Sequence, residues 1–179
     1  YGEGCAERRV LGRLLRETGF NWSEIASAIE SCDLAVLARK LADGVEEGVL
    51  GETIRYTKGR IHGDLHLGNI LLGRHSVVID FARSCIGPIA VDASRLVCDF
   101  VLRCESIRGG RVPKWDDVGQ GGLADLGPIR EEYELLGGDE KLFAILLCFE
   151  LGRALSYEDI GAATKDWIRT VVKREGELA

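Results

Sequence analysis

The chain lacks the sequence features that direct a protein to a membrane. No apolar run is long enough to cross a bilayer, and the first residues do not form the charged and apolar pattern of a signal peptide. We therefore expect a cytoplasmic protein with no membrane partner. The chain also contains no methionine and begins at Tyr1, which predicts that it is a piece of a longer protein.

Paired cysteines and an excess of basic charge are also missing. The six cysteines include no pair separated by two residues, and their spacing indicates neither a zinc site nor a set of disulfides, so we expect reduced, mostly buried thiols. Lysine and arginine number 23 against 29 aspartates and glutamates. Because binding to a nucleic-acid backbone calls for a basic face, we expect no nucleic-acid partner.

The chain does have enough apolar sequence for one folded domain, since 46% of its 179 residues are hydrophobic. Apolar residues at helical spacing predict helices over 6–18, 22–29, 34–45, 91–107, 139–151 and 163–175. Alternating or β-branched runs predict short strands over 53–57, 69–72 and 77–81, with turns at 58–60 and 73–76 and a loop over 109–128. The last two strands should form a hairpin. The predicted fold class is α+β, predominantly helical.

The most informative segment reads HGDLHLGNILL from His62 and, after a turn, VVIDF up to Phe81. Asp64 and Asn69 lie five residues apart at the entry to the predicted hairpin, and Asp80 lies at its exit, so these three polar side chains can converge. Phosphoryl transfer needs an oriented acceptor hydroxyl and neutralisation of the developing charge. Asp64 is therefore the candidate base, and the oxygens of Asn69 and Asp80 suit Mg²⁺.

This segment resembles the catalytic core of the aminoglycoside phosphotransferase and choline kinase-like families, which are relatives of the protein kinases. Their catalytic loop reads His-Gly-Asp-(Leu/Phe)-His-x-x-Asn and their metal strand reads Ile-Asp-Phe. The resemblance implies that Asp64 is the catalytic residue and that Asn69 and Asp80 are the metal ligands. It also implies the C-terminal lobe of a protein kinase-like fold, with a small β hairpin carrying the catalytic loop. The implied activity transfers a phosphoryl group from ATP, or another nucleoside triphosphate, with Mg²⁺ to a hydroxyl of a small molecule.

The same resemblance implies supporting roles for residues around the loop. His62 and His66 would pack and hydrogen-bond the loop, and Asp92 would hold it from the start of the next helix. The family builds its acceptor site from helices of this lobe that carry acidic residues. The candidates in the corresponding half of this chain are Glu150, Glu158 and Asp159.

The N-terminal lobe of these kinases has no visible counterpart in the sequence. That lobe has a five-stranded sheet, a loop that covers the phosphates and a lysine that pairs with them, and nothing before His62 resembles it. We therefore expect a single C-lobe domain over 1–179, with a helical lead-in over 1–60, the catalytic loop and metal hairpin over 61–93, and a helical remainder over 94–179. The residues that bind the nucleotide stay unknown, and we expect this chain alone to be inactive or nearly so.

Two alternatives to a phosphotransferase stay open. One is a non-catalytic kinase-like module that binds a ligand or a signalling partner and lacks its nucleotide lobe. The other is a metal-dependent hydrolase, because His62, Asp64 and His66 alternate as zinc ligands do on a strand. Such a site would need further ligands, and the third histidine of the chain, His75, lies in the predicted hairpin turn.

Overall fold

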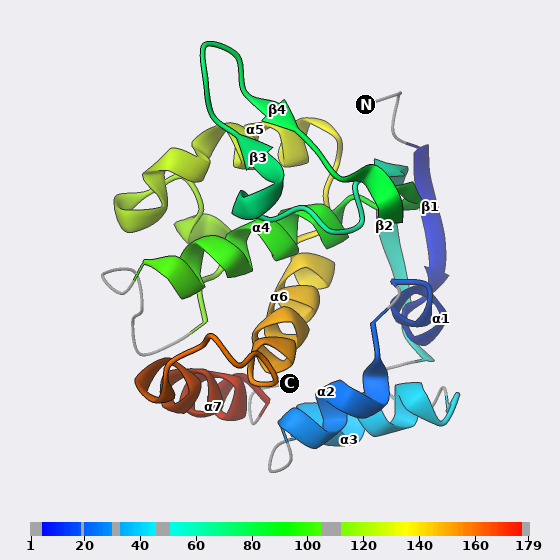
Figure 1. Cartoon of the computed structure of the whole chain (residues 1–179). Helices are drawn as coiled ribbons and strands as arrows, with labels where there is room; N and C mark the ends of the chain where they lie inside the picture. The colour runs from blue at the N-terminus through cyan, green and yellow to red at the C-terminus, as the bar shows by residue number, and fades with distance from the viewer. Residues whose placement is uncertain (1–4, 19, 30–32, 46–50, 105–111, 177–179) are drawn as a thin grey trace.

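The computed structural model describes residues 5–18, 20–29, 33–45, 51–104 and 112–176. Within these ranges the chain is mostly helical and carries two small antiparallel sheets (Figure 1). The helices are α1 (Leu11–Arg16), α2 (Trp22–Ala28), α3 (Asp33–Ala42), α4 (Ala90–Arg103), α5 (Gly127–Leu135), α6 (Glu140–Ala154) and α7 (Ala162–Gly176). The strands are β1 (Cys5–Val10), β2 (Thr53–Ile61), β3 (Ile70–Leu71), β4 (Val77–Val78) and β5 (Cys85–Pro88). This architecture is α+β, as predicted, and is compatible with the C-terminal lobe of a kinase-like fold.

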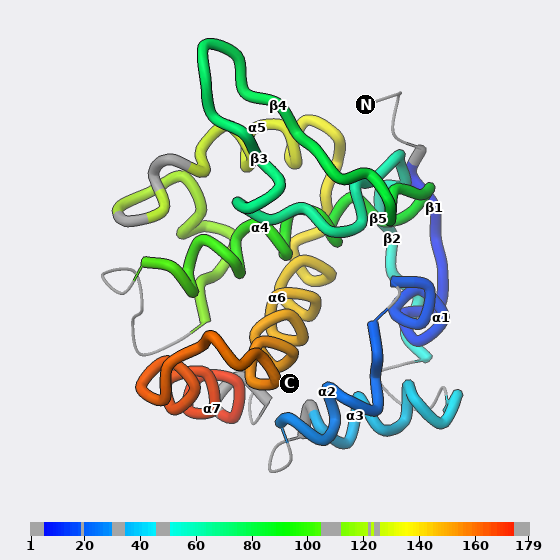
Figure 2. Tube along the Cα trace, in the orientation of Figure 1, coloured from blue at the N-terminus to red at the C-terminus, as the bar shows by residue number. Residues whose placement is uncertain are grey.

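The larger sheet holds both ends of the segment that contains the candidate loop. Its strand order is β1-β2-β5, and β5 lies beside β2 (Figure 2). Side chains reinforce the β1–β2 pairing: the Tyr56 hydroxyl donates to Glu7 Oε2 (2.8 Å) and Lys58 Nζ donates to Glu7 Oε1 (3.1 Å). Since β2 ends immediately before His62 and β5 leads into α4, this sheet sets where the intervening segment begins and ends.

The prediction of a helical segment over 1–60 is wrong in two places. Residues 5–10 form β1, so the first helix begins only at Leu11. The strand predicted over 53–57 is confirmed, but β2 continues to Ile61 through the predicted turn at 58–60. The predicted apolar stripe is confirmed where the chain is helical, because Leu11, Leu14 and Leu15 of α1 are all buried. The extended form of β1 depends on partners 49 and 51 residues away along the chain, which local periodicity cannot reveal.

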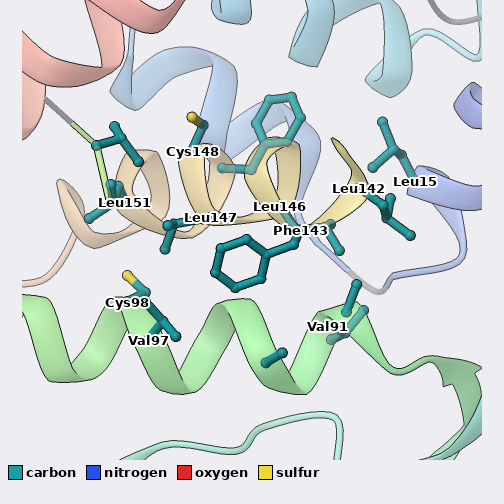
Figure 3. Packing of buried hydrophobic residues seen from close by; sticks show 14 of the residues in the cluster. Leu15, Val91, Val97, Cys98, Leu142, Phe143, Leu146, Leu147, Cys148 and Leu151 are labelled. Atoms are coloured by element: carbon teal, nitrogen blue, oxygen red, sulfur yellow. The ribbon is translucent and has the colours of Figure 1, made fainter. Parts of the chain in front are cut away.

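The core is centred on the contact between α4 and α6. Figure 3 shows Phe143 on α6 projecting toward α4, with Val97 and Cys98 facing it from α4. Phe143 is fully buried, and the ring of Trp115 packs edge-on against it at 4.7 Å between centroids. Elsewhere on α6, Trp22 of α2 packs against Phe149. Because α6 is surrounded in this way, its apolar residues occur all round the helix, and the prediction that it would be buried is confirmed.

Most of the other helices agree with the sequence pattern. Asn21 caps α2 by accepting from the Glu24 N–H at 3.3 Å, and α7 covers the predicted range. The predicted continuation of α4 to residue 107 lies outside the described residues. Helix α5 was not predicted, because Tyr133 is the only one of its residues to be buried and the rest of its sequence is largely polar.

Two further sequence expectations concern membranes and thiols. None of the helices among the described residues combines the length and the apolar character that a membrane span requires. Cys85, Cys98, Cys104 and Cys148 are not joined in disulfides; Cys98 and Cys148 are buried, whereas Cys85 is exposed. Burial raises the pKa of the Cys98 thiol well above its usual range, which makes this thiol a packing group.

Candidate functional site

The candidate loop is held against α4 by hydrogen bonds to its backbone. Asp92, in the first turn of α4, is buried; its Oδ2 accepts from the His62 N–H (2.6 Å) and its Oδ1 from the Gly63 N–H (2.9 Å). Burial raises the pKa of Asp92, and the two amide donors oppose this rise because they favour the carboxylate. Further along α4, Asp99 Oδ2 accepts from the Leu67 N–H at 2.8 Å. Asp92 and Asp99 are seven residues apart and lie on one helix face, so α4 fixes the loop at two points.

Both ring nitrogens of His62 are used within the loop. Nδ1 accepts from the Asp64 N–H at 3.3 Å, which leaves Nε2 to donate to the carbonyl of Ile79 at 2.7 Å. The ring is 2% exposed and lies 4.7 Å from that of Phe81. His66 likewise accepts from the Gly68 N–H through Nδ1, at 3.1 Å. A zinc site at these histidines would have to break the bonds of His62, so the geometry disfavours the metal-hydrolase alternative.

Gly63 is required by a close approach of two backbones. Its φ is +80°, and a Cβ at this position would lie 2.4 Å from the carbonyl oxygen of Arg83. The Ser84 hydroxyl donates to the carbonyl of Ile61, at 2.8 Å, beside this contact. Only glycine both adopts this φ and leaves room for the carbonyl, which explains the glycine between His62 and Asp64.

Hydrogen bonds connect Asn69 to Asp64 and to the residue before Asp80. β3 and β4 pair as predicted, over fewer residues, and the Ile79 N–H donates to the carbonyl of Asn69 at 2.9 Å. Asp80 therefore follows directly on the residue that pairs with Asn69. The buried Asn69 side chain donates through Nδ2 to the carbonyl of Asp64 at 3.0 Å. With its nitrogen engaged in this way, Asn69 has its amide oxygen to offer as a ligand.

Asp80 has the left-handed backbone conformation, with φ and ψ both 62°. Among the described residues it is the only non-glycine with a positive φ. Such a conformation costs about 1 kcal/mol or more in a non-glycine residue and is often found at functional sites. The carboxylate of Asp80 is exposed at the end of the hairpin.

Asp64 is joined to α4 and α6 by side chains that the motif did not identify. Arg95 Nη2 donates to Asp64 Oδ1 and Arg95 Nη1 donates to Glu150 Oε2, each at 2.8 Å. Arg95 Nη1 also lies 3.2 Å from the hydroxyl of Tyr157, and Arg153 Nη2 lies 2.5 Å from Glu150 Oε2. Burial raises the pKa of Glu150 to about 8, although Arg95 favours its charged form.

A pocket of about 360 Å³ opens beside Arg95, between α4, α6 and the segment after α6. It is lined by His66, Arg95, Cys98, Asp99, Leu102, Arg103, Glu150, Tyr157, Asp159 and Ile160. Two of the three acidic candidates, Glu150 and Asp159, thus line it, whereas Glu158 is exposed and is not among the lining residues. Acidic and basic groups occur together here, so the pocket is polar without a strong charge of one sign.

The donor set at the hairpin suits a magnesium ion. Asn69 and Asp80 offer an amide oxygen and a carboxylate from neighbouring positions. In the described part of the chain, no three or more His, Cys, Asp or Glu side chains form a group that could hold a metal ion. Mg²⁺ in phosphoryl-transfer sites is commonly held by one or two protein oxygens together with phosphates and water, so two donors fit it.

A loop aspartate pinned by a helix, followed by an Asn and an Asp at one end of a hairpin, is the arrangement expected of a kinase-like phosphotransferase. The model of the phosphotransferase enzyme family matches residues 7–136, and the chain belongs to this family. The match begins before β2, so the family resemblance extends well upstream of the motif at His62. Neither the curated proteins nor the solved structures give a match to this chain.

The sequence reasoning missed Asp99 and Arg95, and also Tyr157 and Arg153 beside Arg95 and Glu150. Asp99 could have been found, because it lies seven residues after Asp92 on the same face of a predicted helix. Arg95 had no comparable signal, since its partners are 31 and 55 residues away along the chain.

Proposed function

We propose that the chain carries the acceptor and metal half of an ATP- and magnesium-dependent phosphotransferase that acts on a hydroxyl of a small molecule. The observation that carries this proposal is the position of Asp64: its loop is pinned to α4 through Asp92, and its carboxylate lies at hydrogen-bonding distance from Arg95, which lines the pocket. A carboxylate so placed suits the orientation of an acceptor hydroxyl.

In this proposal, Asp64 orients the acceptor hydroxyl and accepts its proton through the carboxylate oxygen that Arg95 does not hold. Asn69 and Asp80 would hold the metal ion, which when bound would supply neutralisation of charge on the transferring phosphoryl group. His62 and Asp92 keep the loop in position through the bonds described above. Correct placement is the main contribution of the protein to this kind of reaction.

The pocket beside Arg95 is the proposed acceptor site. It is adjacent to Asp64 through Arg95, and its walls offer the hydroxyl of Tyr157 and the carboxyl groups of Asp159 and Glu150. Its size suits a small molecule rather than a polymer. The mixed charge of its walls supports a polar acceptor with several hydroxyl or amino groups.

The test is Asp64→Asn in the full-length protein, with transfer of radiolabelled phosphate from magnesium–ATP as the readout. We expect transfer to fall by a factor of about 10² or more, since a general base typically contributes this much. Glu158→Gln is the matched control, because it neutralises an exposed carboxylate outside the pocket lining and should leave the rate unchanged.

Unchanged transfer in the Asp64→Asn variant would remove Asp64 from the role of base. Binding of magnesium–ATP with no transfer in the unmodified protein would favour the non-catalytic module instead. The same assay on the 179-residue chain tests the expectation that it turns over ATP poorly on its own.

A further inference from the structure

Arg95 lies at the centre of a side-chain network that the family motif does not include. It projects from α4 and is largely buried, with 16% of its side chain exposed. One guanidinium nitrogen, Nη2, contacts Asp64 on the loop, and the other, Nη1, contacts Glu150 on α6. A single planar group therefore joins the candidate base to the central helix of the core.

The two contacts restrict how the guanidinium can lie. Glu150 is 3% exposed and is held by the helix that packs at the centre of the core, so its carboxyl group is a fixed reference point. The Tyr157 hydroxyl, 3.2 Å from Nη1, adds a third contact. Because the nitrogens of a guanidinium have a rigid, planar geometry, fixing Nη1 also fixes the direction of Nη2.

Resting on the function proposed above, we propose that Arg95 is a positioning residue: it ties the carboxylate of Asp64 to Glu150 on α6 and so holds that carboxylate next to the pocket that Arg95 lines. Arg95 occupies Oδ1 of Asp64 and leaves Oδ2 for the acceptor hydroxyl. The loop backbone is held by Asp92 and Asp99, whereas this contact holds the side chain. The two kinds of support are separate, and only the second acts on the base itself.

The chain offers a matched control for Arg95. Arg153 Nη2 contacts the same oxygen of Glu150, and its side chain has a similar exposure of 18%. Among the described residues, the partners found for Arg153 are Glu150 and the rings of Phe20 and Tyr157, and they do not include Asp64. Replacing either arginine removes one guanidinium from Glu150, but only the replacement of Arg95 releases Asp64.

The first experiment measures the contact without relying on activity. Asp64→Asn, Arg95→Met and the double variant are unfolded with urea in the full chain. If the two residues were independent, the change in the unfolding equilibrium constant of the double variant would equal the product of the two single changes. We expect the measured change to differ from this product by about threefold or more, because charged residues in contact are coupled. In the cycle that uses Arg153→Met in place of Arg95→Met, the change in the double variant should equal that product within about twofold. Equal behaviour of the two cycles would overturn the proposed contact.

The second experiment separates positioning from mere packing. With magnesium–ATP, and water as the acceptor, Arg95→Met should lower kcat by about tenfold or more with the KM for ATP within about threefold, because a misplaced base affects the chemical step. Arg95→Lys retains the charge but cannot span both carboxyl groups, so its kcat should lie between that of the wild-type protein and that of Arg95→Met. Arg153→Met should retain kcat within about twofold.

The outcomes distinguish this inference from the proposed function. If the full-length wild-type protein shows no turnover while the Asp64–Arg95 cycle shows coupling, the proposed function fails and the contact stands. If turnover is present and Arg95→Met and Arg153→Met lower kcat equally, Arg95 has only a structural role and the positioning role is refuted.

Discussion

Replacing Asp92 with asparagine should destabilise the protein and loosen the candidate loop. The carboxylate accepts from two loop amides, His62 N–H and Gly63 N–H, at 2.6 and 2.9 Å. Asparagine has one acceptor oxygen, so one of the two loop amides would face the NH₂ group and lose its partner. Hydrogen bonds to charged groups contribute about 1.5–3 kcal/mol each.

The expected loss is smaller than the sum of the two bonds. Burial raises the pKa of Asp92, which means that the native carboxylate carries a desolvation cost that asparagine does not have. We therefore expect Asp92→Asn to lower the free energy of unfolding by about 2–4 kcal/mol. Urea denaturation measures this loss, and amide hydrogen exchange should be faster at His62 and Gly63 than in the wild-type protein.

Asp99→Asn provides the comparison. Asp99 accepts from one loop amide, that of Leu67, and its side chain is 18% exposed and shared with Arg103. Its replacement should cost about 0.5–1.5 kcal/mol, because a partly exposed group can bond to water instead. A loss for Asp92→Asn no greater than that for Asp99→Asn, with unchanged exchange at His62 and Gly63, would refute the assignment of Asp92 as the principal anchor of the loop.

Three further predictions concern the core, the hairpin and Glu150. Phe143→Ala should lower the free energy of unfolding by about 3–5 kcal/mol in urea, because it leaves a cavity between α4 and α6; a loss below about 1 kcal/mol would contradict this packing. Asp80→Gly should leave the free energy of unfolding within about 1 kcal/mol of wild type, or raise it, because glycine adopts a φ of 62° without strain. The same variant should lose magnesium-dependent transfer. A large destabilisation would contradict the left-handed conformation of Asp80. The free energy of unfolding of the wild-type protein should fall as the pH rises from about 5 to about 8. Folded Glu150, with its pKa raised from 4.5 to about 8, keeps a proton in this range that the unfolded chain has lost, and the resulting fall is at most about 5 kcal/mol. Glu150→Gln should flatten this profile, and a wild-type profile that is already flat would show that Glu150 is not shifted.

The parts of the fold that sequence predicted correctly are those stabilised by neighbours along the chain. The cap at Asn21 and the apolar residues of α6 express local rules of helix formation, and both are found in the structure. The hairpin after Asn69 follows from two short runs around a turn. By contrast, β1 was predicted as helix, since its extended form depends on pairing with β2, which lies far along the chain.

The candidate site divides in the same way. The spacing of Asp64, Asn69 and Asp80 was sufficient to predict one loop and one hairpin, because all three lie within a single short segment. The family match then places this chain among the phosphotransferases. These conclusions needed only residue types and their order.

The tertiary structure alone decided what supports Asp64. Arg95 and Glu150 are 55 residues apart and belong to different helices, yet α4 and α6 pack so that one guanidinium spans Glu150 and Asp64. No local pattern encodes this contact, because it depends on the angle and depth at which two helices meet. The sequence by itself therefore determined which side chains are present, and the packing of the helices determined which of them hold Asp64 in place.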